Sequence, residues 1–264
     1  MELLRFELLL PNFALVLARI AGMALAIPIF ASSQIPRAYI AGLVVILSLM
    51  IFPAVAPLLP GELSLGQALT GMVGEFVLGE ILGLAVGAVF FAAQIAGQVV
   101  SHQAGLSLGQ VYNPLFDEET TVVDQIWFFS VMVLFFALRG HLAAVEAVLG
   151  SFRQVPPMML VGGAALGDFV MAVTRSIFEA ALRLAGPAVL ALLLTSLIMG
   201  FLTKTMPQLN IFSVGFSLKI CTGLLMVAVT LAHADGVVAR ELYDRFDDLG
   251  ALMQQLSRQV IDAG

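Results

Sequence analysis

The sequence predicts an all-α integral membrane protein with about six apolar helices, several of them kinked or broken. Composition is the first ground for this prediction. Of the 264 residues, 60% are hydrophobic and only 11% are charged, whereas about 25% of the residues in a soluble globular chain are charged. Mean hydropathy is +1.03. So few charged side chains cannot cover a surface that faces water, so most of this surface must face lipid or other protein.

Long apolar stretches are the second ground. A helix that crosses a hydrocarbon core about 30 Å thick needs about 20 apolar residues. Stretches that meet this length are 12–30, 38–59, 67–100, 184–202 and 211–231. Pro187, after Gly186, is expected to kink the fourth of these or to begin it. A further apolar stretch, 126–138, ends at Arg139, and apolar residues resume only after His141. The sequence therefore leaves open whether this stretch crosses the membrane.

The distribution of basic residues predicts the orientation. If all six stretches cross, only Arg37 and Lys204 lie on the outer side. The basic residues on the inner side are then Arg5, Arg153, Arg175, Arg183, Arg240, Arg245 and Arg258. Loops on the cytoplasmic side carry the excess of Lys and Arg, so both termini are predicted to be cytoplasmic, provided that the stretch around Arg139 crosses. The scattered basic residues suggest no nucleic-acid partner.

Glycines recur at helical spacing in the third stretch. Gly79, Gly83 and Gly87 follow one another every four residues, and Glu75 lies one step earlier. Small residues at this spacing form a narrow helix face that another helix backbone can approach closely. Packing is the simplest interpretation of this face, and it is also a candidate assembly face.

A polar stripe continues the same helix. Gln94, Gln98 and His102 recur at the same spacing, which is unfavourable in lipid unless the stripe faces protein or a watery cavity. Together with Glu75 and Glu80, the stripe is predicted to be an assembly or conduit face.

Charged residues inside apolar stretches suggest an alternative function. Arg19 and Lys219 interrupt otherwise apolar stretches and are expected to face a partner or a cavity. With Glu75 and Glu80 they would suit a secondary transporter or proton channel. Such transporters usually contain internal repeats, and no convincing repeat is present.

A remote alternative is an intramembrane serine protease. Residues 105–109 spell G-x-S-x-G around Ser107, but a nucleophile elbow needs a strand before it. The three histidines are too far apart in sequence for a zinc motif. No cofactor, metal or catalytic residue is therefore predicted from these patterns.

The segment 110–124 differs from the apolar stretches. It contains Asn113-Pro114 and the acidic residues Asp117, Glu118 and Glu119, without a Lys or Arg. Long loops in compact helical proteins are uncommon and are often functional. A functional loop and an exposed connection without a function of its own are therefore equally weighted interpretations of this segment.

The C-terminal segment has the most regular apolar pattern. Apolar residues alternate at spacings of four and three, and they are Leu242, Phe246, Leu249, Met253, Leu256 and Val260. This pattern predicts an amphipathic helix that docks on a partner or back on its own chain.

A series of motifs in a set order makes the chain resemble a known family. The motifs are Arg19-Ile20-Ala21-Gly22, Pro28-Ile29-Phe30, Ile35-Pro36-Arg37, Gly74-Glu75, Gly79-Glu80-Ile81-Leu82-Gly83, Ala96-Gly97-Gln98, Gly105-Leu106-Ser107, Asn113-Pro114, Gly140-His141, Ser151-Phe152, Pro156, Pro187, Leu202-Thr203-Lys204, Pro207-Gln208-Leu209-Asn210-Ile211-Phe212 and Gly215-Phe216-Ser217-Leu218-Lys219-Ile220. In order and spacing they resemble the FliR family of flagellar biosynthetic proteins, whose counterparts serve in virulence type III secretion.

The resemblance implies a non-enzymatic subunit of a type III protein export gate in the bacterial inner membrane, at a flagellar basal body or an injectisome base. The implied partners are FliP-like and FliQ-like subunits, an FlhB-like switch protein, unfolded export substrates and membrane lipid. By this resemblance, residues 1–183 form a FliP-like part, 184–233 a FliQ-like helical hairpin and 234–264 an amphipathic cytoplasmic helix.

The resemblance also implies site residues. The loop 106–119 would enter the channel as a plug, with Leu106, Ser107, Leu108, Gln110, Asn113, Pro114, Phe116, Asp117, Glu118 and Glu119 as its residues. The implied assembly face comprises Glu75, Gly79, Gly83, Gly87, Gln94, Gln98, Lys204, Pro207, Gln208 and Lys219. At two positions this chain departs from the family pattern. It has Asn113 before Pro114 where the family usually has Asp, and Arg139 before Gly140 where the family often has Asp.

Overall fold

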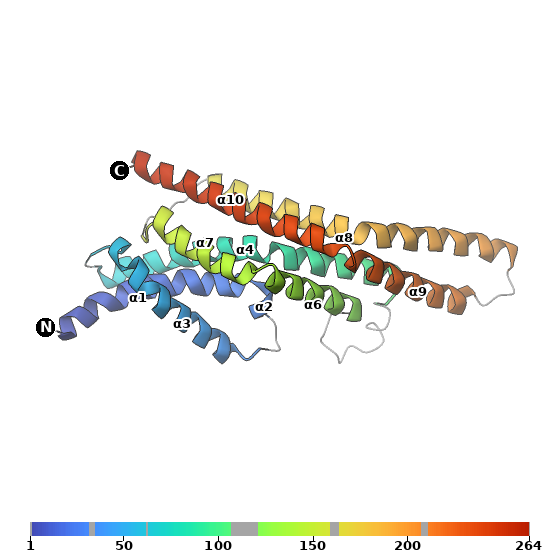
Figure 1. Cartoon of the computed structure of the whole chain (residues 1–264), viewed down its shortest axis with the longest axis horizontal. Coiled ribbons are helices and arrows are strands. Elements are labelled where there is room, and N and C mark those ends of the chain that lie inside the picture. The colour runs from blue at the N-terminus through green and yellow to red at the C-terminus, as the bar shows by residue number, and fades with distance from the viewer. Residues whose placement is uncertain are drawn as a thin grey trace. The chain divides into compact units, whose positions relative to one another are not determined.

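The chain folds into α-helices, as predicted (Figure 1). The structure is a computed structural model that describes residues 2–31, 35–61, 63–106, 121–158, 164–206 and 211–263. The helices within these ranges are α1 (Glu2–Ala26), α2 (Pro28–Ala31), α3 (Arg37–Val55), the 3₁₀ helix η1 (Ala56–Leu58), α4 (Leu65–Ala104), α6 (Val122–Ala137), α7 (Gly140–Gln154), α8 (Ala164–Thr205), α9 (Ile211–Leu231) and α10 (Ala234–Ala263). No strand occurs in these ranges.

Four of the described helices are long and apolar enough to cross a membrane, and they contain Arg37–Leu58, Gly66–Ala104, Ala165–Thr205 and Val214–Leu231. The count becomes five if the bent pair α6 and α7 is one span, against the six that the sequence predicts. The difference lies in α1, whose apolar part Leu10–Ala26 is shorter than the others. Pro28 begins α2, and proline has no N–H with which to continue the preceding helix.

Arg139 divides the sixth apolar stretch. Its φ of 58° and ψ of 27° lie in the left-handed region. Residues other than glycine rarely adopt this backbone conformation. The helix therefore stops at Ala137 and restarts at Gly140, with a bend of 68° between α6 and α7. The crossing of a membrane by this pair stays a prediction. The predicted cytoplasmic position of both termini depends on it and stays a prediction too.

The chain divides into two compact units, each made of segments that are discontinuous in sequence. Unit 1 contains Met1–Ala88, Arg139–Thr174 and Leu242–Gly264, and unit 2 contains Val89–Leu138 and Arg175–Glu241. The predicted boundary at 183/184 falls inside α8, which continues through Pro187, so this proline neither begins nor ends a helix. Proline is tolerated inside membrane helices because neighbouring groups satisfy the carbonyl that it leaves unpaired.

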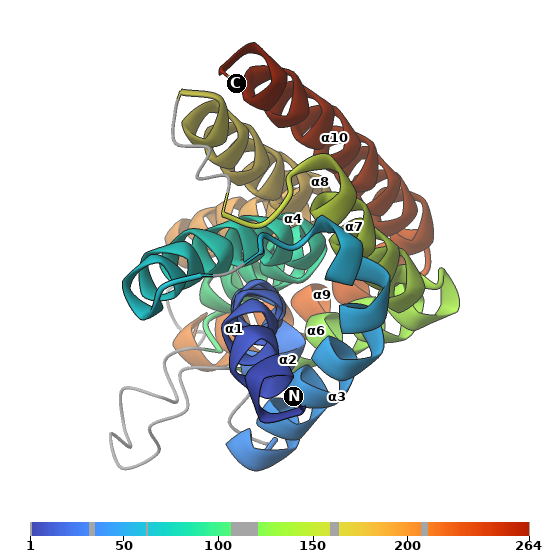
Figure 2. The same cartoon turned by 90° about the vertical axis from the view of Figure 1, so that its left-hand side faces the viewer.

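Glycines set the closest helix contact in unit 1. A Cβ added at Gly79 would lie 2.1 Å from the carbonyl oxygen of Arg19, and one at Gly83 would lie 2.4 Å from that of Met23. Gly22 of α1 approaches a carbonyl oxygen of α4 in the same way, at 2.2 Å from its added Cβ. The backbones of α1 and α4 therefore pack at a distance that only glycine permits. In the same unit α3 lies beside α1 (Figure 2).

The C-terminal helix α10 docks on its own chain. Leu249, Met253 and Leu256 of unit 1 are buried, whereas Asp247 and Asp248, just before Leu249, and Gln254 and Gln255, after Met253, are exposed. The predicted amphipathic helix is thus confirmed, and of its two predicted docking partners the structure shows the chain itself.

Aromatic packing joins α4 and α6 in unit 2. The ring of Phe90 lies 5.1 Å from that of Phe135 and 5.9 Å from that of Phe128, measured between centroids. Trp127 of α6 is fully buried. The Phe90 ring pairs therefore pack α6 against the second half of α4.

Candidate functional site

A buried ion pair joins α1 to α4 in unit 1. Arg19 Nε donates to Glu75 Oε2 at 2.6 Å, and the two side chains are 0% and 2% exposed. A charge taken out of water is stable only when it is paired and its remaining hydrogen-bonding groups are satisfied. The neighbours of both residues therefore decide whether this pair can persist.

The remaining groups of the pair are satisfied by α7 and the turn that follows it. Arg19 Nη1 donates to Ser151 Oγ at 3.1 Å, and Nη2 donates to the carbonyl of Val155 at 3.0 Å. The guanidinium carbon also lies 4.1 Å from the centre of the Phe152 ring, which adds a cation–π contact.

Glu75 uses its second oxygen in the same way. Its Oε1 accepts from the backbone N–H of Met158 at 3.1 Å. Met158 has a φ of 74°, in the left-handed region. The ion pair and its neighbours, here called the Arg19–Glu75 node, thus tie together α1, α4, α7 and the turn after α7.

The node changes the interpretation of three predicted residues. Arg19 was expected to face a partner, and Glu75 of the same chain is that partner. Gly79 packs against α1, so its close backbone contact lies within the chain. Both Glu75 and Gly79 therefore have structural roles inside unit 1, and their predicted role in assembly stays a prediction.

A second polar cluster lies where α4 ends and α6 begins, in unit 2. Ser101 Oγ donates to Asp124 Oδ1 at 3.1 Å and shares a further hydrogen bond with Thr121 Oγ1. Because the one Ser101 proton goes to Asp124, the Thr121 hydroxyl must donate to Ser101. Thr121 and Asp124 also form a capping box, in which Asp124 Oδ2 accepts from the Thr121 N–H at 2.8 Å.

Close backbone packing accompanies this cluster. A Cβ added at Gly97 of α4 would lie 2.8 Å from the Cα of Asp124. Gly105, with a φ of 82°, closes α4, and the N–H of Leu106 donates to the carbonyl of Ser101 at 3.0 Å. Ser101, Thr121, Asp124 and Gly97, here called the loop base, therefore hold together the two ends of the segment that separates α4 from α6.

Sequence reasoning missed the loop base, although part of its signal was present. Thr121-Val122-Val123-Asp124 matches the pattern [ST]-x-x-[DE] that precedes a helix, whereas these residues were assigned to the end of the segment 110–124. Ser101 and Ser151 gave no sequence signal, because a single serine in a helix is usually bonded to its own backbone.

Most of the predicted plug lies outside the described residues. Leu106 is half-buried. The other predicted plug residues, Ser107, Leu108, Gln110, Asn113, Pro114, Phe116, Asp117, Glu118 and Glu119, lie outside the described ranges. The segment before Gly105 is helix α4 and not a strand, so the G-x-S-x-G pattern lacks the context of a nucleophile elbow.

The other predicted assembly residues differ in exposure. Gln98, His102 and Lys204 are exposed, Glu80, Gln94 and Lys219 are half-buried, and Gly83 and Gly87 are buried. Pro207 and Gln208 lie outside the described ranges. The polar stripe on α4 is thus exposed at its C-terminal end, where a neighbouring protein could contact it.

Comparison with known proteins identifies the family. Residues 10–244 match the family described as "Bacterial export proteins, family 1". The chain belongs to this family. The match includes the Arg19–Glu75 node and the loop base, and it ends inside α10.

Relatives in this family come from flagellar and secretion systems. The flagellar biosynthetic protein FliR of Bacillus subtilis (strain 168) is 25% identical over 228 residues, which cover 85% of this chain and 87% of the relative. FliR of Escherichia coli (strain K12) is 29% identical over 222 residues, with 81% and 82% covered. The secretion system apparatus protein SsaT of Salmonella typhimurium is 23% identical over 164 residues, with 62% and 63% covered.

Proposed function

We propose that this chain is a membrane-embedded subunit of a bacterial type III protein export gate, in its flagellar form. The supporting observation is the family match over residues 10–244 of an all-α chain with several long apolar helices. The FliR relatives of Bacillus subtilis and Escherichia coli cover more of the chain than the secretion relative SsaT does, which favours the flagellar form.

The proposed subunit acts by assembly and not by chemistry. Its partners would be FliP-like and FliQ-like subunits and an FlhB-like switch protein in the inner membrane. Residues 1–183 would act as the FliP-like part and residues 184–233 as the FliQ-like hairpin. The apolar side chains that α8 and α9 leave exposed, such as Leu194, Phe201 and Leu225, support a helical surface that neighbouring subunits or lipid cover.

The loop 106–119 would occlude the closed channel through which unfolded substrates pass. The loop base supports this role, because Ser101, Thr121 and Asp124 fix both ends of the connection to one point. Deletion of 107–119 should let ions leak through the inner membrane while the complex still assembles. Unchanged membrane tightness in cells that contain the assembled variant would contradict the plug.

The overall proposal is tested by deletion of the gene and complementation. The deletion strain should lose flagellar export and swimming, and the intact chain should restore both. Normal export of flagellar subunits in the deletion strain would refute the proposal.

The two alternatives have separate tests. A transporter or proton channel should conduct when the purified chain alone is placed in liposomes, whereas a gate subunit should be inert there. Arg19 and Glu75 suggested such a pathway, but they bind each other inside unit 1. For the protease, Ser107→Ala should abolish function, whereas a gate subunit should keep most of it.

A further inference from the structure

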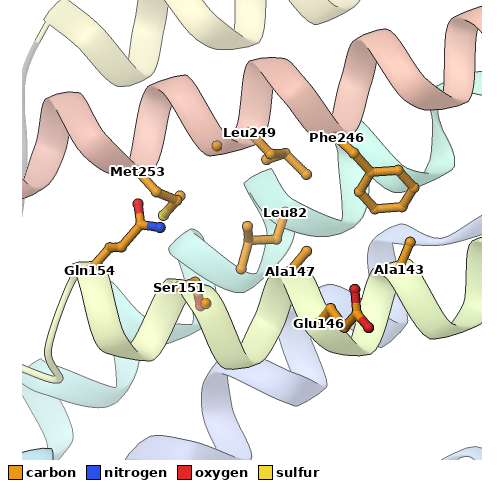
Figure 3. Close-up of a pocket in the computed structure, with 11 residues that line it drawn as sticks. Leu82, Ala143, Glu146, Ala147, Ser151, Gln154, Phe246, Leu249 and Met253 are labelled. Carbon is orange, nitrogen blue, oxygen red and sulfur yellow. The ribbon is translucent and has the colours of Figure 1, made fainter.

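A partly open cavity lies between α7 and α10 in unit 1, with α4 behind it (Figure 3). Its volume is about 250 Å³, and Leu82, Leu249 and Met253 supply apolar walls. Pockets for drug-sized ligands have volumes of about 300–1,000 Å³. The cavity is therefore too small for such a ligand and suits a single large side chain.

Small residues give access to this cavity. Ala143, Ala147 and Gly150 line it along α7, and Gly250 lines it on α10. A Cβ added at Gly150 or at Gly250 would meet no atom within 4 Å, so these glycines leave space that the chain does not fill. Small residues on a helix face allow a third helix to approach closely.

The polar groups around the cavity are a carboxylate, an amide and a hydroxyl, and two of them have acceptor oxygens without a partner among the described residues. Glu146 lines it from α7 with an exposed carboxylate, and within the described ranges no ion pair of Glu146 occurs. Gln154 lines the cavity from the end of α7, near Met253 (Figure 3), and its Oε1 is buried without a hydrogen-bond partner in the described part of the chain. The Ser151 hydroxyl already donates to the carbonyl of Val148 and accepts from Arg19.

Among the residues that the structure describes, no basic side chain lines the cavity. Arg245 of α10 has an ion pair with Asp248 at 2.7 Å, and Arg153 of α7 is exposed but is not among the lining residues. The cavity thus has one uncompensated negative charge, an acceptor without a donor and an apolar middle. A long apolar stem that ends in a positive charge matches these features.

We infer that this cavity receives a lysine or arginine side chain from a helix of another subunit of the export gate. The stem would pack on Leu249 and Met253, and the charged end would pair with Glu146. A helix is the expected carrier, because the small residues that line the cavity along α7 allow another helix to approach closely. The inference rests on the proposed function for the kind of partner.

The family match ends at residue 244, so the α10 wall of the cavity, which contains Phe246, Leu249, Gly250 and Met253, lies beyond it.

Variants that fill the cavity test the inference. Gly150→Leu and Gly250→Leu each place a side chain in the open space, and both replace glycine in a helix by a better helix former. Gly167→Leu is the matched control, because Gly167 is an exposed helical glycine with the same open surroundings and does not line the cavity. Thermal unfolding of each purified full-length chain should show no loss of stability.

The measurement is the amount of each gate subunit that co-purifies with the tagged full-length chain from host membranes. Gly150→Leu and Gly250→Leu should reduce one subunit by about ten-fold, which corresponds to about 1.4 kcal/mol, and Gly167→Leu should leave it unchanged. Glu146→Lys should cause the same loss, whereas Asp168→Lys, which reverses another exposed acid, should not. Replacement of one lysine or arginine of the lost subunit by glutamate should then restore binding to Glu146→Lys.

Several results would overturn the inference. Unchanged co-purification in the filling variants, or an equal loss in Gly167→Leu, would show that the cavity is not a contact. Failure of every Lys→Glu and Arg→Glu replacement in the lost subunit to restore binding would exclude a basic side chain. Native mass spectrometry that finds a phospholipid held through Glu146 would make lipid the occupant, and loss of self-association alone would make it a second copy. Normal export in the gene deletion would refute the proposed function, and this result does not depend on any cavity variant.

Discussion

Removal of either charge from the Arg19–Glu75 node should strongly destabilise the protein. In Glu75→Gln the fully buried guanidinium keeps only neutral acceptors, which include Ser151 Oγ and the carbonyl of Val155. In Arg19→Met the buried carboxylate keeps the N–H of Met158 but loses its counter-ion. Breaking a buried ion pair by removing one partner costs about 3–5 kcal/mol, so each single variant should lose about that much free energy of unfolding.

The double variant Arg19→Met/Glu75→Leu separates the ion pair from the packing. It leaves no buried charge in the node, and the Ser151 hydroxyl still bonds the carbonyl of Val148. The carbonyl of Val155 and the N–H of Met158 lose their partners, at about 1–3 kcal/mol each. The double variant should therefore lose about 2–6 kcal/mol of the free energy of unfolding, whereas the losses of the two single variants sum to about 6–10 kcal/mol.

The assay is thermal unfolding of the purified full-length chain in mild detergent, followed by circular dichroism. For a chain of this size 1 kcal/mol shifts the midpoint by about 2–4 °C, so each single variant should unfold about 6–20 °C lower. Single variants that lose less than about 1 kcal/mol, or a double variant that equals the sum of the singles, would refute the role of the node.

Three further predictions concern a close helix contact, a helix cap and a left-handed residue. Gly79→Ala should prevent stable folding, because its Cβ would lie 2.1 Å from a backbone oxygen of α1, whereas the control Gly42→Ala, with nothing within 4 Å, should raise stability by up to about 1 kcal/mol in thermal unfolding. Thr121→Ala removes the cap that accepts from Asp124 N and should cost about 0.5–2 kcal/mol, with faster hydrogen exchange at the start of α6; exchange equal to that of the parent would contradict the capping box. Arg139→Gly should raise the unfolding midpoint, because glycine adopts a φ of 58° without the strain of about 1–2 kcal/mol that other residues have there; a lower midpoint would argue against that conformation.

The candidate sites were only partly predictable, and the residues explain why. The spacing of Glu75, Gly79 and Gly83 predicted a face for close backbone packing, and the structure shows that α1 of the same chain occupies it at Gly79 and Gly83. Sequence spacing identifies such a face, but it does not say which helix covers it. Ser151 lies 132 positions from its partner Arg19, and no local pattern indicates a contact over that separation.

The sequence by itself determined the fold class, the family and the amphipathic C-terminal helix, because each depends on composition, order of motifs or local periodicity. Only the tertiary structure decided that Glu75 is the partner of Arg19, that α8 continues through Pro187, and that α7 and α10 leave a cavity beside Glu146. These features depend on which residues, distant in sequence, come into contact, and that follows from the packing of whole helices against one another. Local patterns restrict each helix face to a few possible neighbours, and only the folded chain selects one of them.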